Sequence, residues 1–74
     1  MTIKDRFDLL INHYADGNKS LFARKIGVAN TVIENIVGKR KGNPSFQVLQ
    51  KIALTLDSVN LRWLIIGSGE IFIK

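Results

Sequence analysis

The stretch FARKIGVANTVI at residues 22–33 decides the fold. One short helical pattern closes at Ile26, Gly27 follows it as a stop, and a second pattern begins at about Asn30. Glycine readily adopts the left-handed conformation in which many helices end. Two short helices joined by a turn of three to four residues that contains glycine form a recurrent unit. The stretch therefore predicts helices at about 19–26 and 30–37 that cross closely at the small residue Ala23.

The second helix of this unit has an apolar side and a polar side. Ile33 and Ile36 are spaced to anchor the helix to a core, and Val28 fills the elbow before it. The first helix contributes an inner face of Phe22, Ala23 and Ile26. The opposite, outward side of the second helix carries Asn30, Thr31, Glu34 and Asn35. Gly38 ends this helix, and a basic loop at 39–44 follows.

Three further helical patterns flank the unit, at about 3–15, 46–56 and 61–66, because apolar residues recur there at helical spacing. Over 46–56 we expect the inward side chains to be Leu49, Ile52, Ala53 and Leu56. Good N-caps precede the patterns at Thr2, Asn18, Ser45 and Asn60. Asp5 lies three residues after Thr2, as in a capping box. No segment alternates long enough to demand a sheet, so the predicted class is all-α with five helices.

The positive charge is concentrated in one part of the chain. The net charge of the 74 residues is +5, and the window 19–41 alone holds six basic side chains against the single acidic Glu34. The segments before and after it nearly balance. A localised basic stretch is typical of nucleic-acid binders. A solvated, solubilising surface gives the same pattern, so charge alone leaves both interpretations open.

Several function classes lack the residues they need. The chain has no cysteine and a single histidine, His13, for which we expect a surface or packing role rather than metal binding. No acid–base or nucleophile constellation stands out, so we expect no enzyme activity, no cofactor and no small-molecule substrate. The start lacks the pattern of a signal peptide, and no apolar run approaches the roughly 20 residues that span a bilayer. We therefore expect a cytoplasmic protein that does not enter membranes.

The ordered set of motif residues resembles the Cro/repressor-type (XRE-like) helix-turn-helix family. It comprises Ala23, Gly27, Val28 and Ile33, then the loop residues Gly38 to Arg40, then Pro44 and Ser45 opening a helix with Leu49, Ile52 and Ala53. The ending, Asn60 to Leu64 with Gly67 and Gly69, is similar to the close of the N-terminal DNA-binding domain of some phage-type repressors. Two positions depart from the family pattern. Lys19 replaces the usual glutamine, and Ala29 replaces the usual Ser or Thr cap.

The resemblance implies a compact, lambda-repressor-like domain over residues 1–70, with the helix-turn-helix at about 18–38 and an apolar tail at 71–74. It also implies that the third helix reads base edges in the major groove of duplex DNA. By position, the base-reading candidates are Asn30, Thr31, Asn35 and Glu34. For Glu34, however, we favour an ion pair with a nearby Lys or Arg. The phosphate-contacting candidates are Asn18, Lys19, Lys39, Arg40 and Lys41, with Gln47 as a weaker one.

The function that follows from the resemblance is sequence-specific binding of double-stranded DNA, as a transcriptional repressor or regulator of phage or mobile-element type. Because one small module offers few base contacts, we expect a homodimer on a pseudo-palindromic operator. Two alternatives remain: an antitoxin of a toxin–antitoxin pair, and a protein-interaction module that has lost DNA binding.

The end of the chain is unusually apolar, with Ile65, Ile66, Ile71, Phe72 and Ile73. Three interpretations stay open for it. It forms a dimer surface, it begins a linker to a further domain, or it folds back on the core.

Overall fold

The computed structural model describes residues 1–39 and 42–73. Over this part of the chain it shows an all-α globule whose helices are α1 (Ile3–Ala15), α2 (Lys19–Ile26), α3 (Asn30–Val37), α4 (Phe46–Thr55) and α5 (Leu61–Ile66). The described residues form no strand, only one isolated antiparallel bridge between Val59 and Phe72. The predicted all-α class and the five helices are therefore confirmed.

Local signals place the helix ends where the sequence predicted them. Asn18, Ser45 and Asn60 each accept a hydrogen bond from a backbone N–H in the first turn of α2, α4 and α5. Thr2 and Asp5 form a complete capping box at the start of α1. Ala29 caps α3 without a side-chain hydrogen bond. The one displaced end is that of α4, which stops at Thr55 and leaves Leu56 as its C-cap.

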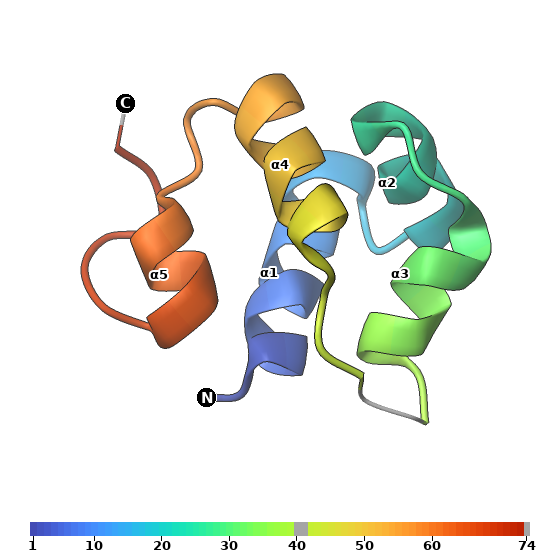
Figure 1. The fold of residues 1–74 in the computed structure, drawn as a ribbon, viewed down its shortest axis with the longest axis horizontal. Coiled ribbons are helices and arrows are strands. Elements are labelled where there is room, and N and C mark those ends of the chain that lie inside the picture. Colours follow the sequence, from blue (N-terminus) through green and yellow to red (C-terminus); the bar gives the residue numbers. More distant parts are fainter. Residues whose placement is uncertain (40–41, 74) are drawn as a thin grey trace.

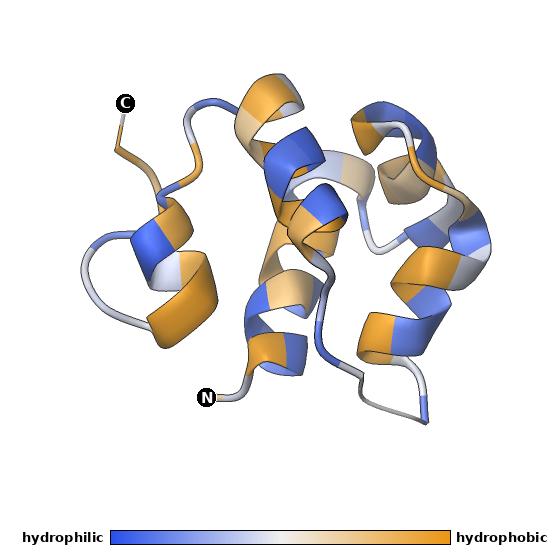
Figure 2. Ribbon diagram, in the orientation of Figure 1, coloured by the Kyte–Doolittle hydropathy of each residue, from blue (hydrophilic) through white to orange (hydrophobic). Residues whose placement is uncertain are grey.

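The helices surround a core to which each of them contributes. Figure 1 shows α5 at one end of the long axis and α2 with α3 at the other, with α1 and α4 between them. The ribbon colours of Figure 2 alternate along the helices, as expected for amphipathic segments around a shared interior. The fully buried large side chains are Phe7, Leu10, Phe22, Ile26, Ile33, Ile52 and Leu64. The inner faces predicted for α2 and α3 are therefore confirmed.

The inward face of α4 differs from the prediction. Val48, Ile52 and Leu56 are buried, whereas Leu49 is only partly buried and Ala53 is exposed. Both sets of positions satisfy the helical period, because apolar residues occupy 48, 49, 52 and 53. The larger Val48 removes more apolar surface from water than Ala53 would, which favours the face that the structure adopts.

Arg6 is a buried charged residue that sequence reasoning missed. Its side chain is only 8% exposed. Its Nε donates to the carbonyl of Leu64 at 2.9 Å, and its terminal nitrogens donate to the carbonyls of Met1 at 2.8 Å and Ile65 at 3.2 Å. The last carbonyls of a helix lack partners within the helix, and cations are favourable there. Arg6 therefore joins α1 to the end of α5.

The apolar tail folds back on the domain as far as Phe72, one of the three interpretations of this segment. The Asn60 N–H donates to the Ile71 carbonyl and the Ile73 N–H to the Ser58 carbonyl, both at 2.8 Å. Ile71 and Phe72 pack against the core. Ile73 is 62% exposed, and Lys74 lies outside the described residues. None of the helices described is both long and apolar enough to cross a bilayer.

Candidate nucleic-acid interface

The turn between α2 and α3 holds the two helices in a fixed relation. Gly27 has φ 84°, and the N–H groups of Gly27 and Val28 both donate to the Ala23 carbonyl at 2.9 Å. A left-handed residue with such hydrogen bonds is a common helix ending and satisfies a carbonyl that the helix leaves free. Ala23 is 1% exposed, as expected for a small side chain on the inner face of α2.

The outward face of α3 carries the predicted base-reading candidates. Asn30, Thr31, Glu34 and Asn35 are all exposed, while Ile33, Ile36 and Val37 are buried on the opposite side. Within residues 1–39 and 42–73, the side chains of Asn30, Thr31 and Asn35 make no hydrogen bond. The face therefore combines a well-anchored helix with polar groups that are free to bind a ligand.

Glu34 differs from its neighbours because it has a partner. Its carboxylate lies 3.9 Å from the ammonium of Lys19, which belongs to the first turn of α2. The prediction that Glu34 pairs with a nearby basic residue is confirmed. The side chains are 41% and 48% exposed for Lys19 and Glu34, so the pair is solvated and contributes little to stability. Its effect is to place Lys19 at the edge of the α3 face.

Two of the other phosphate-contacting candidates, Asn18 and Lys39, lie within the described residues. Asn18 uses its side-chain oxygen to cap α2 at 3.0 Å from the Leu21 nitrogen, which leaves its amide NH₂ as a donor. Lys39 is exposed directly after Gly38. Arg40 and Lys41 lie outside the described residues. The backbone on both sides of them is tied to α3, because Gly38 and Gly42 donate to the carbonyls of Glu34 and Asn35 at 2.7 Å.

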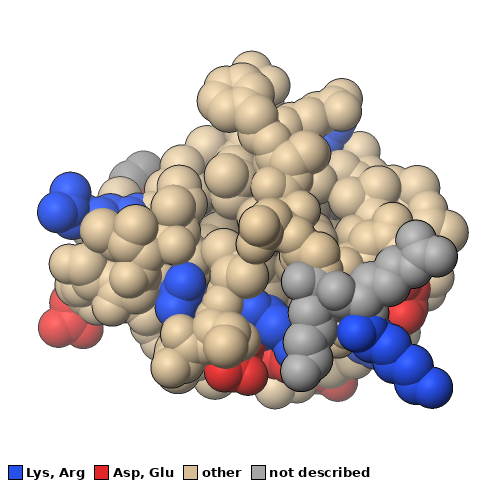
Figure 3. Space-filling view, turned by 60° about the horizontal axis from the view of Figure 1, so that its bottom comes forward, with Lys and Arg blue, Asp and Glu red and all other residues tan. Residues whose placement is uncertain are grey.

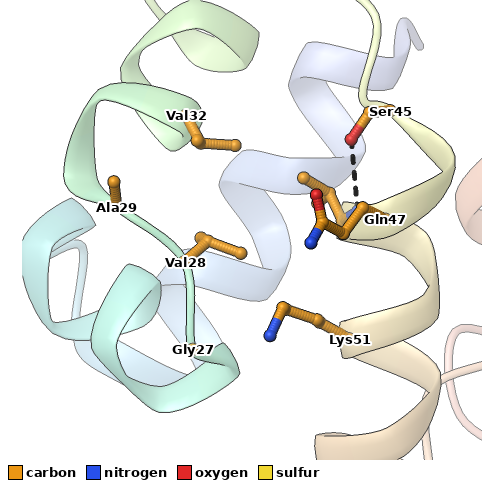
Figure 4. Close-up of a pocket in the computed structure, with 8 residues that line it drawn as sticks. Gly27, Val28, Ala29, Val32, Ser45, Gln47 and Lys51 are labelled. Carbon is orange, nitrogen blue, oxygen red and sulfur yellow. Dashed lines mark hydrogen bonds between the residues drawn. The ribbon is translucent and has the colours of Figure 1, made fainter.

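A polar hollow separates the α2–α3 turn from α4 and is visible in Figure 4. We call it the α3–α4 groove. It measures about 290 Å³ and is lined by Gly27, Val28, Ala29, Val32, Ser45, Gln47, Val48 and Lys51. The side chains of Gln47 and Lys51 point from α4 toward the turn. Lys51 was not singled out in the sequence, since no local motif marks it. Only the packing of α4 brings it beside residues 27–29.

Charges of both signs occur on the face shown in Figure 3, which brings the lower side of Figure 1 forward. Basic side chains there are separated by acidic and uncharged ones, apart from the residues drawn in grey. The basic side chains on the described part of this face therefore do not form one uninterrupted patch.

Several titratable side chains of α1 have local structural partners. The ring of His13 packs against the ring of Phe72, with 4.7 Å between the ring centroids. It lies edge-on to the ring of Tyr14, with 4.8 Å between the centroids. The hydrogen bond from the Thr2 backbone N–H lowers the pKa of Asp5, and the hydrogen bond to Asp8 raises the pKa of Lys4. No three His, Asp or Glu side chains among the described residues come together as metal ligands.

Known proteins provide no independent assignment. Comparison finds no protein-family model, no curated protein and no solved structure that matches the chain. The resemblance to the Cro/repressor-type family therefore remains a prediction based on the motif residues themselves.

Proposed function

We propose that this chain binds double-stranded DNA in a sequence-specific manner and acts as a transcriptional repressor or regulator. In this proposal α2, the turn at 27–29 and α3 form a helix-turn-helix of the Cro/repressor type, and α3 enters the major groove. The supporting observation is the outward face of α3. Asn30, Thr31 and Asn35 are exposed and without hydrogen-bond partners among the described residues, on a helix anchored by buried Ile33 and Ile36.

The side chains on this face suit base edges. An asparagine amide can donate to N7 and accept from N6 of adenine when it is held in the right plane, and a threonine methyl can contact the thymine methyl. Lys19 and Lys39 would contact phosphates on either side, together with Asn18 and with Arg40 and Lys41 from outside the described residues. Phosphate contacts fix the register and supply affinity, while the α3 contacts supply the specificity.

A homodimer on a pseudo-palindromic operator follows from the small size of the site. The three reading residues on one helix can contact only a few base pairs. Two copies double the contacts if their half-sites are separated by about 34 Å, one turn of the double helix. Exposed apolar side chains at the end of α5, Ile65 and Ile66, are available for such a contact.

Exposed apolar residues on α4 favour a second candidate function, an antitoxin or another protein-interaction module. Phe46 is 78% exposed and Leu54 is 76% exposed. Exposed large apolar side chains mark protein-binding surfaces where they form a contiguous patch. An antitoxin would use both surfaces, α3 for its operator and α4 for its toxin. A pure interaction module would use only α4.

Selection from random duplexes tests the proposal. The purified chain is incubated with random double-stranded DNA, and the bound sequences are compared with those recovered by the double variant Asn30→Ala/Thr31→Ala. Asn12→Ala, an exposed asparagine on α1, is the matched control. We expect a palindromic consensus for the wild type and the control, and loss of the consensus in the double variant.

Two other outcomes would count against this reading. Binding without enrichment, steeply weakened by salt, would indicate a backbone binder with no sequence specificity. No binding even at low salt would reject DNA recognition and favour the protein-interaction module.

A further inference from the structure

The α3–α4 groove is well placed to bind a group next to the reading face of α3. A second hollow of about 260 Å³ lies along the same helix and shares Val32 and Ser45 with the groove. Asn35, one of the proposed base readers, lines this second hollow. The groove and the reading face are therefore neighbouring parts of one surface.

The groove carries one basic side chain beside neutral polar ones. Among the described residues, Lys51 is the only charged one that lines the groove, and none of the lining residues is acidic. Within the described part of the chain Lys51 makes no ion pair. The Lys51 ammonium lies close to the turn. If Gly27 carried a Cβ atom, that atom would be 3.7 Å from the Lys51 Nζ. The Gln47 amide projects into the same space from one turn earlier on α4.

The size and openness of the groove fit a hydrated anion. Its volume of about 290 Å³ is roughly ten times the ~30 Å³ that a water molecule takes up in the liquid. Ser45 accepts a hydrogen bond from the Val48 N–H at 3.3 Å. Its own O–H can still donate to a ligand, beside the Gln47 amide and the Lys51 ammonium. An ammonium and an amide NH₂ are both common donors to phosphate oxygens.

Each flank of α3 then carries a basic side chain. Lys19 lies on the α2 side of the helix, beside Glu34, and Lys51 with Gln47 lies on the α4 side, beyond Val32. A helix in the major groove, which is about 12 Å wide, has a phosphate backbone on each side of it. One cation on each flank matches that arrangement.

We propose that the α3–α4 groove binds a phosphate of the DNA backbone through the Lys51 ammonium and the Gln47 amide. This inference rests on the proposed function, because it assigns a second contact to the same DNA. Lys51 supplies the charge and Gln47 the directed hydrogen bond. Neither residue touches a base edge, so the contact adds affinity without adding specificity.

The test measures DNA affinity against salt concentration for the full chain and its variants, on the selected duplex and on a scrambled one. Lys51→Met should lower affinity equally for both duplexes and reduce the slope of log affinity against log salt by about 1. Lys51→Arg should restore both. Gln47→Ala should weaken binding by about five-fold without changing the slope, because it removes a neutral donor. Arg62→Met, with the same charge change at an exposed position of α5, is the control.

The outcomes separate the two proposals. If the wild type binds DNA and Lys51→Met has the same slope as wild type, the groove does not hold a phosphate and the proposed function stands without it. If Lys51→Met and Arg62→Met lower the slope equally, the effect is general charge and the inference fails.

The remaining case is a wild-type chain that binds no duplex. It is tested by titrating the chain with inorganic phosphate while NMR records the amide signals of residues 27–29 and 47. Signals that move in a wild type unable to bind any duplex would point to a free anion as the ligand. That result would overturn both proposals in their present form.

Discussion

The two ends of the long axis use their polar side chains in opposite ways (Figure 1). At the α1–α5 end, Arg6 donates to three backbone carbonyls, and the Asn60 side chain both caps α5 and donates to the Glu70 carbonyl at 2.8 Å. At the α2–α3 end, the side chains of Thr31 and Asn35 have no such partner among the described residues. The first end bonds these polar groups internally, whereas the reading residues of α3 leave theirs open to solvent.

This difference separates stability from function. A polar group removed from an internally bonded network leaves its partners unsatisfied and destabilises the fold. A polar group removed from the exposed α3 face changes little in the folded chain but removes a potential contact to a ligand. Variants of the internally bonded groups at the α1–α5 end should therefore lower the free energy of unfolding, and variants of the exposed polar residues on α3 should alter mainly binding.

The largest effect is expected for Arg6→Met. Methionine keeps the bulk of the side chain but leaves the carbonyls of Met1, Leu64 and Ile65 without their donor. We expect the free energy of unfolding to fall by about 3 kcal/mol. Denaturant unfolding followed by the fluorescence of Trp63, the only tryptophan, measures it.

The exposed Arg62 provides the control, because Arg62→Met removes the same charge from α5 and should stay within about 0.5 kcal/mol of the wild type. If Arg6→Met were equally mild, water would be replacing the guanidinium, and the contrast between the two ends would weaken.

The next effect concerns the tail. Phe72→Ala removes a ring that lies 4.7 Å from His13 and 6.2 Å from Tyr14, so we expect a loss of about 2 kcal/mol of stability. Burial raises the pKa of Tyr14, the only tyrosine, and exposure of its ring in the variant should lower that pKa toward the ordinary value. An alkaline absorbance titration reports this directly.

Ile73→Ala, at an exposed position of the same tail, should change neither stability nor the Tyr14 titration. An unchanged Tyr14 pKa in Phe72→Ala would mean that the tail does not cover the tyrosine in solution.

The sequence predicts those features that depend on nearby residues. The N-caps at Asn18, Ser45 and Asn60 and the stop at Gly27 are encoded within a few positions, and the structure has them all. The exposed positions on α3 follow from the helical period of Ile33 and Ile36. These signals needed no knowledge of how the helices pack.

The features that the sequence does not predict depend on residues far apart. Arg6 bonds to a carbonyl 58 positions away, and no local pattern marks that contact. The groove joins the turn at 27–29 to Lys51 for the same reason. The predicted rotation of α4 was wrong because Val48 and Ala53 offer two faces of equal period, and only the packing of the core selects the one with Val48.

A smaller effect is expected for Glu34→Gln. The variant removes the carboxylate 3.9 Å from Lys19, and its effect on stability should be below about 0.5 kcal/mol because the pair is solvated. Under the proposed function, DNA affinity at low salt should rise several-fold, since phosphates no longer compete with Glu34 for the ammonium. The rise should disappear in Glu34→Gln/Lys19→Met. A loss of affinity instead would indicate that Glu34 itself reads a base.

The smallest effect belongs to the capping box at the start of α1, where the polar groups are internally bonded but fully exposed. The Thr2 N–H donates to the Asp5 carboxylate at 2.9 Å and lowers its pKa, with a further contribution from the Thr2 hydroxyl. A carboxyl whose pKa is lower in the folded chain stabilises it above the unfolded value of 3.8. That contribution disappears as the pH falls through the folded pKa.

Asp5→Asn should therefore be slightly less stable than wild type near neutral pH and should converge with it in acid below the folded pKa. Thr2→Val separates the two causes, because it removes the hydroxyl and keeps the backbone donor. If the N–H is the main cause, the Asp5 pKa in this variant stays below its ordinary value but rises part of the way, as a carboxyl NMR titration would show. If the Asp5 pKa returned completely to its ordinary value, the hydroxyl would be the cause of the lowered pKa. The backbone hydrogen bond would then have no measurable role.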